Sequence, residues 1–511
     1  MIENNTREFN KFQEIFFPIH KHELKKFLPM SFLMFLILFV YNLTRSLKDL
    51  FVQYSTTLWK DARPEESTSL LSALKFWYVL PCAFIVVIAF TALLNKFGPD
   101  KSFHITIIAF MVFYGVFGYL IYPNLDHLIM SEEKVTLIVQ SIPTFFRTFV
   151  ICAINWPISL FYIMSELWGT MAISSLFWQF ANRVTLKHEV KRFFGLFSLL
   201  ANIGTIIAGG TISNYAQSLD DEHVRNLMIM VLITCSAIMA TYSYINKVVL
   251  KNDIIDDIQN IPLKNSKKPK VSAMEGIKIL VKNPYLLLIS VLIIAYGVTI
   301  NFSQILMKAS MKETFDKATY AQMQGILTIF TGIFGIIVVL LGTNILRKFS
   351  WKTSAIITPL AFLIFGGIFF CAVIYKQFIG TTIFGVSAMI IATWFGIIND
   401  ALVRSIKYSL FDSTKSMAYI PLDEASRTKG QAATEMIGGR IGKAGSSMVQ
   451  QVMVSYPRVL VTATGSYGGV LAYTPHIVGI FFVAVIMWIF AVLKLSNQYE
   501  EKVKNSECAN D

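Results

Sequence analysis

The stretch with the clearest chemical character is a polar run that begins SLFDSTKSMAYIPLDEASRTKGQ and ends IGGRIGKAGSSMVQQ. Its second part places two cations, Arg440 and Lys443, among glycines and other small residues. Gly438, Gly442 and Ser446 recur every four residues, so they would form a helical ridge that lets another helix approach closely. Two cations on such a helix indicate an anion-binding site.

The pair Gly442-Lys443 invites comparison with the phosphate loop of ATP-hydrolysing proteins. That loop needs a Gly five residues before its second Gly and a Ser or Thr directly after the Lys. In this chain Ile437 and Ala444 occupy those positions, so the pattern does not match. An ATP-hydrolysing machine of that kind is therefore not predicted.

Composition places these cations in a membrane. The 511 residues are 54% hydrophobic and only 15% charged, whereas soluble domains average about 25% charged residues. The apolar residues lie in long runs, which predicts an all-α polytopic membrane protein in a lipid bilayer. The net charge of +13 fits the excess of Lys and Arg in cytoplasmic loops, so we expect no nucleic-acid partner. The scattered Cys and His residues predict no metal and no cofactor.

The apolar runs predict about twelve membrane-spanning helices, because about 20 residues are needed to cross the bilayer. The fourth run is long enough to tilt or to begin before the bilayer. The eleventh run holds the glycine-rich motif, is the least hydrophobic, and would be missed by hydropathy alone. The predicted spans are roughly 28–52, 70–94, 102–122, 148–181, 192–216, 226–250, 284–307, 318–343, 352–375, 378–401, 432–457 and 469–494.

A polar, basic linker at 251–283 divides the predicted helices into an N-terminal half at 28–250 and a C-terminal half at 284–494. Secondary transporters are commonly built from two such six-helix repeats. The loops on the side of the N-terminal segment (1–27), the linker and the tail (495–511) are net basic. Both termini are therefore predicted to be cytoplasmic.

The first span carries a cluster of polar side chains. Asn42, Arg45 and Asp49 recur at helical spacing and share a face, and Lys48 lies one turn from Arg45. An ionisable residue inside a span costs about 3 kcal/mol on insertion scales, so these residues are candidates for function. The alternative is that they snorkel at a helix end, with Asp49 paired to Arg45.

The fourth span carries Glu166 with apolar residues on both sides. A carboxylate in that position needs a cation or hydrogen-bond donors, which Arg45, Lys48 or Lys443 could supply. A purely structural ion pair is the alternative to a role in binding.

The seventh span carries Asn301, Gln304 and Lys308. Its amides either line a cavity or form hydrogen bonds between helices. For Arg440 and Lys443, the alternative to a binding site is contact of an interfacial helix with lipid headgroups. Taken together, several cations, one carboxylate and amides predict a central cavity that suits a polyphosphate joined to a flat base.

Four motifs resemble the nucleotide-transporting ADP/ATP carriers of obligate intracellular bacteria and plastids. The similarity covers residues 27–495, and the last of the motifs is very specific to that family. The motifs are TRSLKD, MSELWGTMAISSLFWQFAN, KRFFGLFSLLANIGT and LFDSTKSMAYIPLDEASRTKGQAATEMIGGRIGKAGSS.

The resemblance implies twelve helices in two major-facilitator-like halves, a place in the cell inner membrane and strict exchange of nucleotides. A Lys of the first helix, the Glu of the ELWG motif and the Lys of a GKSG-type motif correspond to Lys48, Glu166 and Lys443. The family's Glu in the seventh helix corresponds to Gln304, which cannot carry negative charge. The GKSG motif also departs here, because Ala444 follows the Lys. We expect a monomer.

These observations predict an antiporter that exchanges host ATP for bacterial ADP by alternating access. The alternative is import or exchange of other nucleotides (GTP, CTP, UTP or NAD), with or without proton coupling, because Gln304 replaces the family's Glu. In either case cations would hold phosphates, Glu166 would orient one of those cations, and Gln304 would contact base or ribose. The candidate substrate-binding residues are Lys48, Glu166, Gln304, Arg440, Lys443 and Arg45.

Two rival classes make different predictions. A membrane enzyme acting on polyphosphates needs a nucleophile or metal cluster at a membrane face, and the sequence shows no paired carboxylates with His at suitable spacing. We therefore expect no enzyme. A channel would give net flux without a counter-substrate, and a receptor would give no flux.

Overall fold

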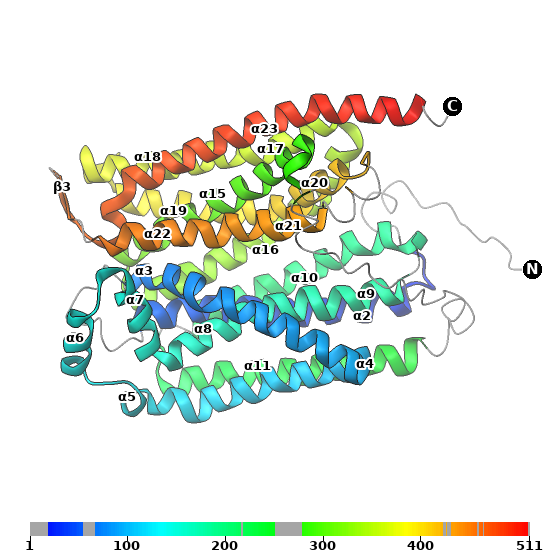
Figure 1. The fold of residues 1–511 in the computed structure, drawn as a ribbon. Coiled ribbons are helices and arrows are strands. Elements are labelled where there is room, and N and C mark those ends of the chain that lie inside the picture. Colours follow the sequence, from blue (N-terminus) through cyan, green and yellow to red (C-terminus); the bar gives the residue numbers. More distant parts are fainter. Residues whose placement is uncertain are drawn as a thin grey trace, which may run out of the picture.

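The computed structural model describes residues 19–508, except 55–66, 186, 216–217, 251–277, 279, 423–425, 427–430, 457–458 and 463. These residues form two layers of long helices that run nearly parallel to one another (Figure 1). The N-terminal layer contains the described residues from 24 to 249, and the C-terminal layer contains residues 284–508. The start of α2 and the end of α23 lie at the same end of the molecule, here called the terminal end.

The N-terminal layer consists of α-helices joined by short π- or 3₁₀-helical segments, which are labelled η. Its elements are α2 (Leu24–Tyr54), α3 (Ser67–Ala73), η3 (Leu74–Val79), α4 (Leu80–Val116), η4 (Phe117–Ile121), η5 (Tyr122–Asn124), α5 (Leu125–Leu128), α6 (Glu132–Ser141), α7 (Thr144–Ile154), α8 (Trp156–Trp168), η6 (Gly169–Phe177), α9 (Trp178–Val184), α10 (Lys187–Tyr215), α11 (Asp221–Tyr244) and η7 (Ile245–Val249).

The C-terminal layer has the same character and adds two short antiparallel hairpins, β1–β2 and β3–β4. Its elements are α15 (Pro284–Thr314), α16 (Lys317–Lys348), α17 (Trp351–Ala361), η8 (Phe362–Gly366), α18 (Gly367–Phe378), β1 (Thr382–Ile383), β2 (Val386–Ser387), α19 (Ala388–Ile406), η9 (Lys407–Phe411), α20 (Asp412–Ala418), α21 (Gln431–Arg440), η11 (Ile441–Gly445), α22 (Ser446–Ser455), β3 (Leu460–Thr462), β4 (Gly465–Tyr467), η12 (Gly469–Tyr473) and α23 (Thr474–Cys508).

The expectation of about twelve spans agrees with this architecture. In the described part of the chain, 10 helical stretches are long and apolar enough to cross a membrane. The longest, Ser67–Leu128, has 62 residues and holds two crossings, since the backbone turns at Gly98 (φ 74). The predicted eleventh span forms helix over 431–455 but is not among the ten. Hydropathy alone does miss it, as predicted.

Two predicted spans have the wrong limits. The fourth, 148–181, is not one helix: α7 ends and α8 begins around Asn155, whose backbone (φ −85, ψ 41) leaves the helical region. The tenth, 378–401, begins too early, because Phe384 (φ 50) and Gly385 (φ 77) form a tight turn between β1 and β2. Helix α19 therefore starts at Ala388.

The structure describes the predicted linker and tail only in part. The linker 251–283 lies mostly outside the described residues, and α15 begins directly after it, at Pro284. The predicted tail, from residue 495, continues helix α23 as far as Cys508.

Close contacts of small residues hold the two layers together and order the C-terminal layer. Between the layers, a methyl group added to Gly209 of α10 would lie 2.6 Å from the carbonyl oxygen of Gly325 of α16. Within the C-terminal layer, a methyl group on Gly297 of α15 would lie 2.8 Å from the Cα of Gly442. The predicted ridge on the glycine-rich helix is thus confirmed at Gly442, where the two backbones touch.

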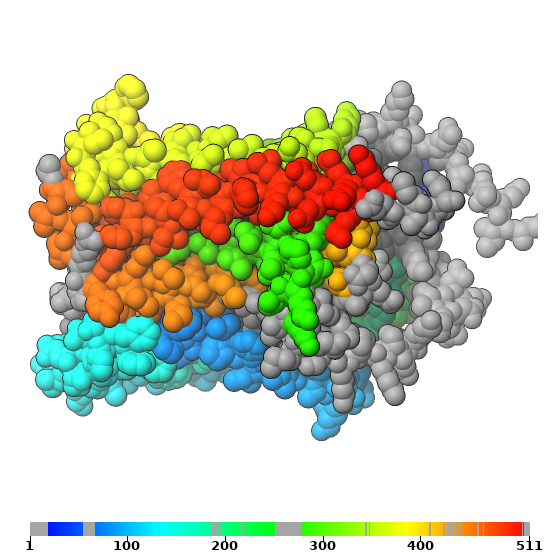
Figure 2. Space-filling model, turned by 45° about the horizontal axis from the view of Figure 1, so that its top comes forward, coloured from blue at the N-terminus to red at the C-terminus, as the bar shows by residue number. Residues whose placement is uncertain are grey.

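The glycine-rich segment lies at the boundary between the layers. Figure 2 shows the orange helices α21 and α22 along the edge of the C-terminal layer, next to the blue helices of the N-terminal layer. Helix α22 contacts α3 and α7, and Ser72 of α3 donates a hydrogen bond to Gln450 of α22. The layers therefore meet at the end that lies away from the terminal end, here called the closed end (Figure 1).

Candidate functional site

Lys48 and Glu166 lie in direct contact between α2 and α8. The Lys48 Nζ is 3.0 Å from Glu166 Oε1, and it also lies 3.9 Å from the centre of the Tyr162 ring. The Lys48 side chain is 2% exposed, whereas that of Glu166 is 33% exposed. Of the three cations considered for Glu166, Lys48 makes this ion pair. The carboxylate and the aromatic face both stabilise the buried ammonium group.

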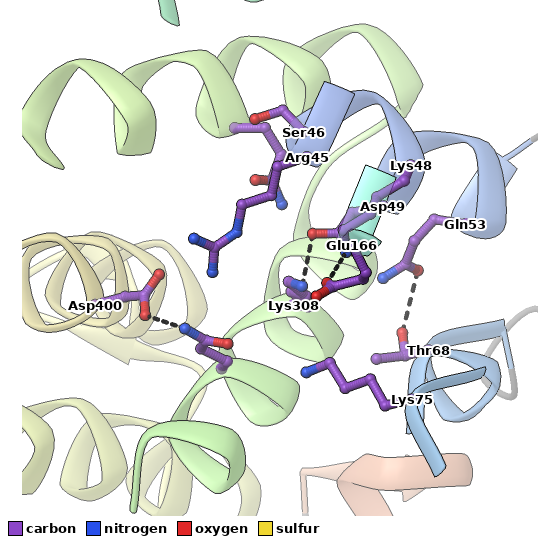
Figure 3. A network of polar contacts seen from close by, with 12 residues as sticks. Arg45, Ser46, Lys48, Asp49, Gln53, Thr68, Lys75, Glu166, Lys308 and Asp400 are labelled. Atoms are coloured by element: carbon purple, nitrogen blue, oxygen red, sulfur yellow. Dashed lines mark hydrogen bonds and ion pairs between the residues drawn. The ribbon is translucent and has the colours of Figure 1, made fainter. Parts of the chain in front are cut away.

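Asp49 extends this ion pair across the layer boundary. Its Oδ1 is 3.0 Å from Lys48 Nζ, and its Oδ2 is 2.7 Å from Lys308 Nζ on α15. Figure 3 shows Asp49 between the two ammonium groups. Glu166, Lys48, Asp49 and Lys308 thus form a row of alternating charges, here called the charge row, that joins the N-terminal and C-terminal layers. Asp49 therefore pairs with Lys48 and Lys308, whereas the alternative had paired it with Arg45 at a helix end.

A second inter-layer contact involves Lys75, which is not among the predicted site residues. Lys75 belongs to η3, and its Nζ donates a hydrogen bond of 3.1 Å to the Oδ1 of Asn301 on α15. The amide nitrogen of Asn301 in turn donates to the carbonyl oxygen of Lys443, at 3.2 Å, and to Ser446 Oγ, at 3.0 Å. Asn301 therefore links Lys75 to the glycine-rich helix.

Gln304 lies in a third polar group, one turn further along α15. Its Nε2 donates to the Oδ1 of Asp400 on α19 at 2.8 Å, and the other oxygen of Asp400 pairs with Arg404. Asp400 is fully buried. A Glu in the position of Gln304 would meet this carboxylate with a like charge, whereas the Gln side chain donates a hydrogen bond to it.

Arg45 projects from α2 toward the space between the layers (Figure 3). Its guanidinium donates to the hydroxyl of Tyr41, at 3.1 Å. A cavity of about 10 Å³ beside it is lined by Asp49, Gln324 and Arg404, among others. That volume holds about one water molecule, so this gap admits no nucleotide in the present conformation.

The remaining two candidates lie on the glycine-rich helix. Lys443 belongs to η11 and its side chain is exposed, although its backbone packs against Gly297. Arg440 ends α21, and its side chain lies outside the described residues. The structure therefore pairs Lys48 with Glu166 and Gln304 with Asp400. The Asn301 amide connects the backbone of Lys443 to Lys75.

The sequence did carry signals for the residues that were missed. Lys75 is a single cation in the apolar run SLLSALKFWYVLP, which by itself marks a candidate. Asp400 and Arg404 were not among the predicted site residues, and the predicted tenth span, 378–401, ends beside Asp400. With α19 at Ala388–Ile406, Asp400 lies well inside the helix.

Comparisons with known proteins agree on one family. A family model described as TLC ATP/ADP transporter matches residues 2–499. The ADP,ATP carrier protein 1 of Rickettsia bellii is 36% identical over 508 residues, which is 98% of each chain. The ADP,ATP carrier protein 1 of Chlamydia pneumoniae is 33% identical over 528 residues, covering 100% of this chain and 99% of that protein.

Solved structures of other transporters share the fold. A bacterial homologue of the iron transporter ferroportin, in an inward-facing state, gives a TM-score of 0.58 at 12% identity and covers 92% of this chain and 99% of its own. The nucleoside transporter NupG gives 0.53 at 14% identity, over 92% of this chain and 98% of its own. These likenesses confirm the predicted major-facilitator-like arrangement.

Proposed function

The chain belongs to the TLC ATP/ADP transporter family, and we propose that it exchanges host ATP for bacterial ADP across the cell inner membrane. Its relatives are named ADP,ATP carrier proteins, which favours this pair of substrates over GTP, CTP, UTP or NAD. Its family and its apolar helices together make it a multi-pass membrane transporter.

The observation that carries the proposal is the charge row between the layers. Lys48 comes from the N-terminal layer and Lys308 from the C-terminal layer, and Asp49 holds both at 3.0 Å or less. Buried lysines from two moving bodies are suited to a polyphosphate that must contact both bodies at once. Lys443 and Arg440 extend this set of cations along the glycine-rich helix.

Exchange follows from the cost of an empty site. When the layers rock around the site, closure removes water from its cations, and an uncompensated buried charge costs several kcal/mol. The charge row itself is balanced, but Arg45, Lys75 and Lys443 give the site more cations than carboxylates. A nucleotide supplies the missing negative charge, so the loaded protein crosses between the two open states more readily than the empty one. Exchange of ATP⁴⁻ for ADP³⁻ moves one net charge, worth about 2.3 kcal/mol per 100 mV.

The arrangement in the membrane is part of the proposal. We propose that the halves 28–250 and 284–494 move as the two bodies, with segments 1–27, 251–283 and 495–511 in the cytoplasm. The terminal end of the molecule then faces the cytoplasm, and the closed end faces outward. The transporter works as a monomer and leaves the nucleotide chemically unchanged.

Counter-exchange in proteoliposomes tests this function. Vesicles preloaded with ADP should take up labelled ATP, vesicles without internal nucleotide should not, and the recovered ATP should be intact. Lys48→Ala should abolish uptake while the protein still inserts, because the Glu166 carboxylate and the phosphates lose their shared cation. Equal uptake into empty vesicles would indicate a channel, and conversion of ATP would indicate an enzyme.

A further inference from the structure

Both N–H donors of the Asn301 amide are engaged, and this fixes the orientation of the amide. Its nitrogen donates to the carbonyl oxygen of Lys443 and to Ser446 Oγ, and its oxygen accepts from Lys75. A side-chain amide offers two N–H donors and one carbonyl oxygen. With both donors engaged by the glycine-rich helix, the carbonyl oxygen is held toward Lys75 and cannot exchange places with the nitrogen.

Lys75 uses only part of its hydrogen-bonding capacity. An ammonium group has three N–H donors, and in the part of the chain that the structure describes Lys75 gives one of them, to Asn301. Its side chain is partly exposed. Figure 3 shows its nitrogen directed toward the helix that carries Lys308. Two donors thus remain for an incoming group.

The charges near Lys75 also leave room for an anion. The charge row contains two lysines and two carboxylates, and Asp400 is matched by Arg404. Lys75 has a neutral amide as its partner, so it adds a positive charge that this part of the site does not compensate. Keeping such a charge between membrane helices is costly unless a ligand neutralises it.

We propose that Lys75 is a further substrate-binding residue, which contacts a phosphate of the nucleotide, and that Asn301 is the positioning residue that holds it. The proposal rests on the proposed nucleotide exchange. Because the Asn301 amide joins Lys75 to the backbone of Lys443, phosphate bound at Lys75 lies between the charge row and the glycine-rich helix. The residue pair thus connects the two parts of the site that the sequence identified separately.

The competing explanation is that Lys75 and Asn301 only tie the two layers together. Charge substitution separates the two roles. Asn301→Asp places a carboxylate against the Lys75 ammonium group. This would strengthen a tie between the layers, but it would cancel the positive charge that attracts a phosphate. Lys75→Gln removes the positive charge, and Lys75→Arg keeps it.

Equilibrium binding of labelled ATP to the purified full-length protein gives the readout, beside ATP uptake into ADP-loaded vesicles. Loss of a charge-assisted bond to phosphate should raise the Kd for ATP about 10- to 100-fold in Lys75→Gln. Asn301→Asp should also raise it, and Lys75→Arg should stay near the wild type. Lys312→Gln is the matched control, since Lys312 lies one turn beyond Lys308, donates to the backbone of Gln53 and packs on Tyr54.

The outcomes are distinct. If the wild-type protein exchanges ATP, a wild-type Kd in Lys75→Gln or tighter ATP binding in Asn301→Asp overturns the proposal for Lys75 alone. Absence of ATP exchange by the wild-type protein would instead overturn the proposed function itself. If Lys75→Gln fails to fold, Lys75→Arg and Asn301→Asp decide together. The Arg variant keeps the positive charge, whereas the Asp variant sets a carboxylate against Lys75 and also loses the two N–H donors to the glycine-rich helix.

Discussion

Asp49→Asn is expected to loosen the contact between the two layers near the closed end. Asp49 is 5% exposed and holds Lys48 at 3.0 Å and Lys308 at 2.7 Å. In the variant Lys48 still has its ion pair with Glu166, whereas Lys308 loses its carboxylate partner. Leaving one charge of a buried pair without its partner costs about 3–5 kcal/mol. The lower value shifts the balance between the closed and open arrangements of this end by about two powers of ten.

Cross-linking reports this shift directly. Ser72 and Gln450 are hydrogen-bonded across the layers, so cysteines introduced at these two positions should form a cross-link readily once the 5 native cysteines are replaced by serine. Asp49→Asn should slow cross-linking and lower the melting temperature. Adding Lys308→Met should restore part of both, because the charge without a partner is then removed as well.

The cycle of single and double variants decides whether the row acts as a unit. Coupled residues give effects that do not add, so the double variant should be more stable than Asp49→Asn alone. Unchanged cross-linking in Asp49→Asn, or simple addition of the Asp49→Asn and Lys308→Met effects, would refute the reasoning.

The two remaining predictions concern packing and charge around α15. Gly297→Ala should lower stability by about 1–3 kcal/mol, because the added methyl group would lie 2.8 Å from the Gly442 Cα. Gly439→Ala is its control, since none of the described residues lies within 4 Å of a methyl group there. Equal melting temperatures of the two variants would contradict the close contact. Gln304→Glu should reduce both the melting temperature and ATP uptake, because it sets a carboxylate against buried Asp400, which lies 2.8 Å from the Gln304 amide nitrogen. Adding Asp400→Asn should recover stability. A fully stable Gln304→Glu protein would mean that the two groups do not interact.

The sequence was sufficient for the helices and for part of the site. Apolar runs set the number of spans, because the bilayer requires about 20 residues for each crossing. The ridge of small residues predicted a close helix contact, which Gly442 makes with Gly297. Glu166 required a cation, and Lys48 was among the three named.

What the sequence could not provide was the pairing across the layers. Lys308 meets Asp49 from 259 residues away, and helical spacing carries no information about such a partner. Lys75 meets Asn301 in the same way, from 226 residues away. Local breaks were also hidden, because the turn at Phe384 and Gly385 lies between two apolar runs.

The central claim is that lysines from both layers hold the phosphates of one nucleotide. A structure of the wild-type protein with ATP bound tests it most directly. The account predicts phosphate oxygens within hydrogen-bonding distance of Lys48 and Lys75, with the C-terminal layer contributing Lys308 or Lys443. Phosphates bound away from these lysines, or held by one layer only, would contradict it.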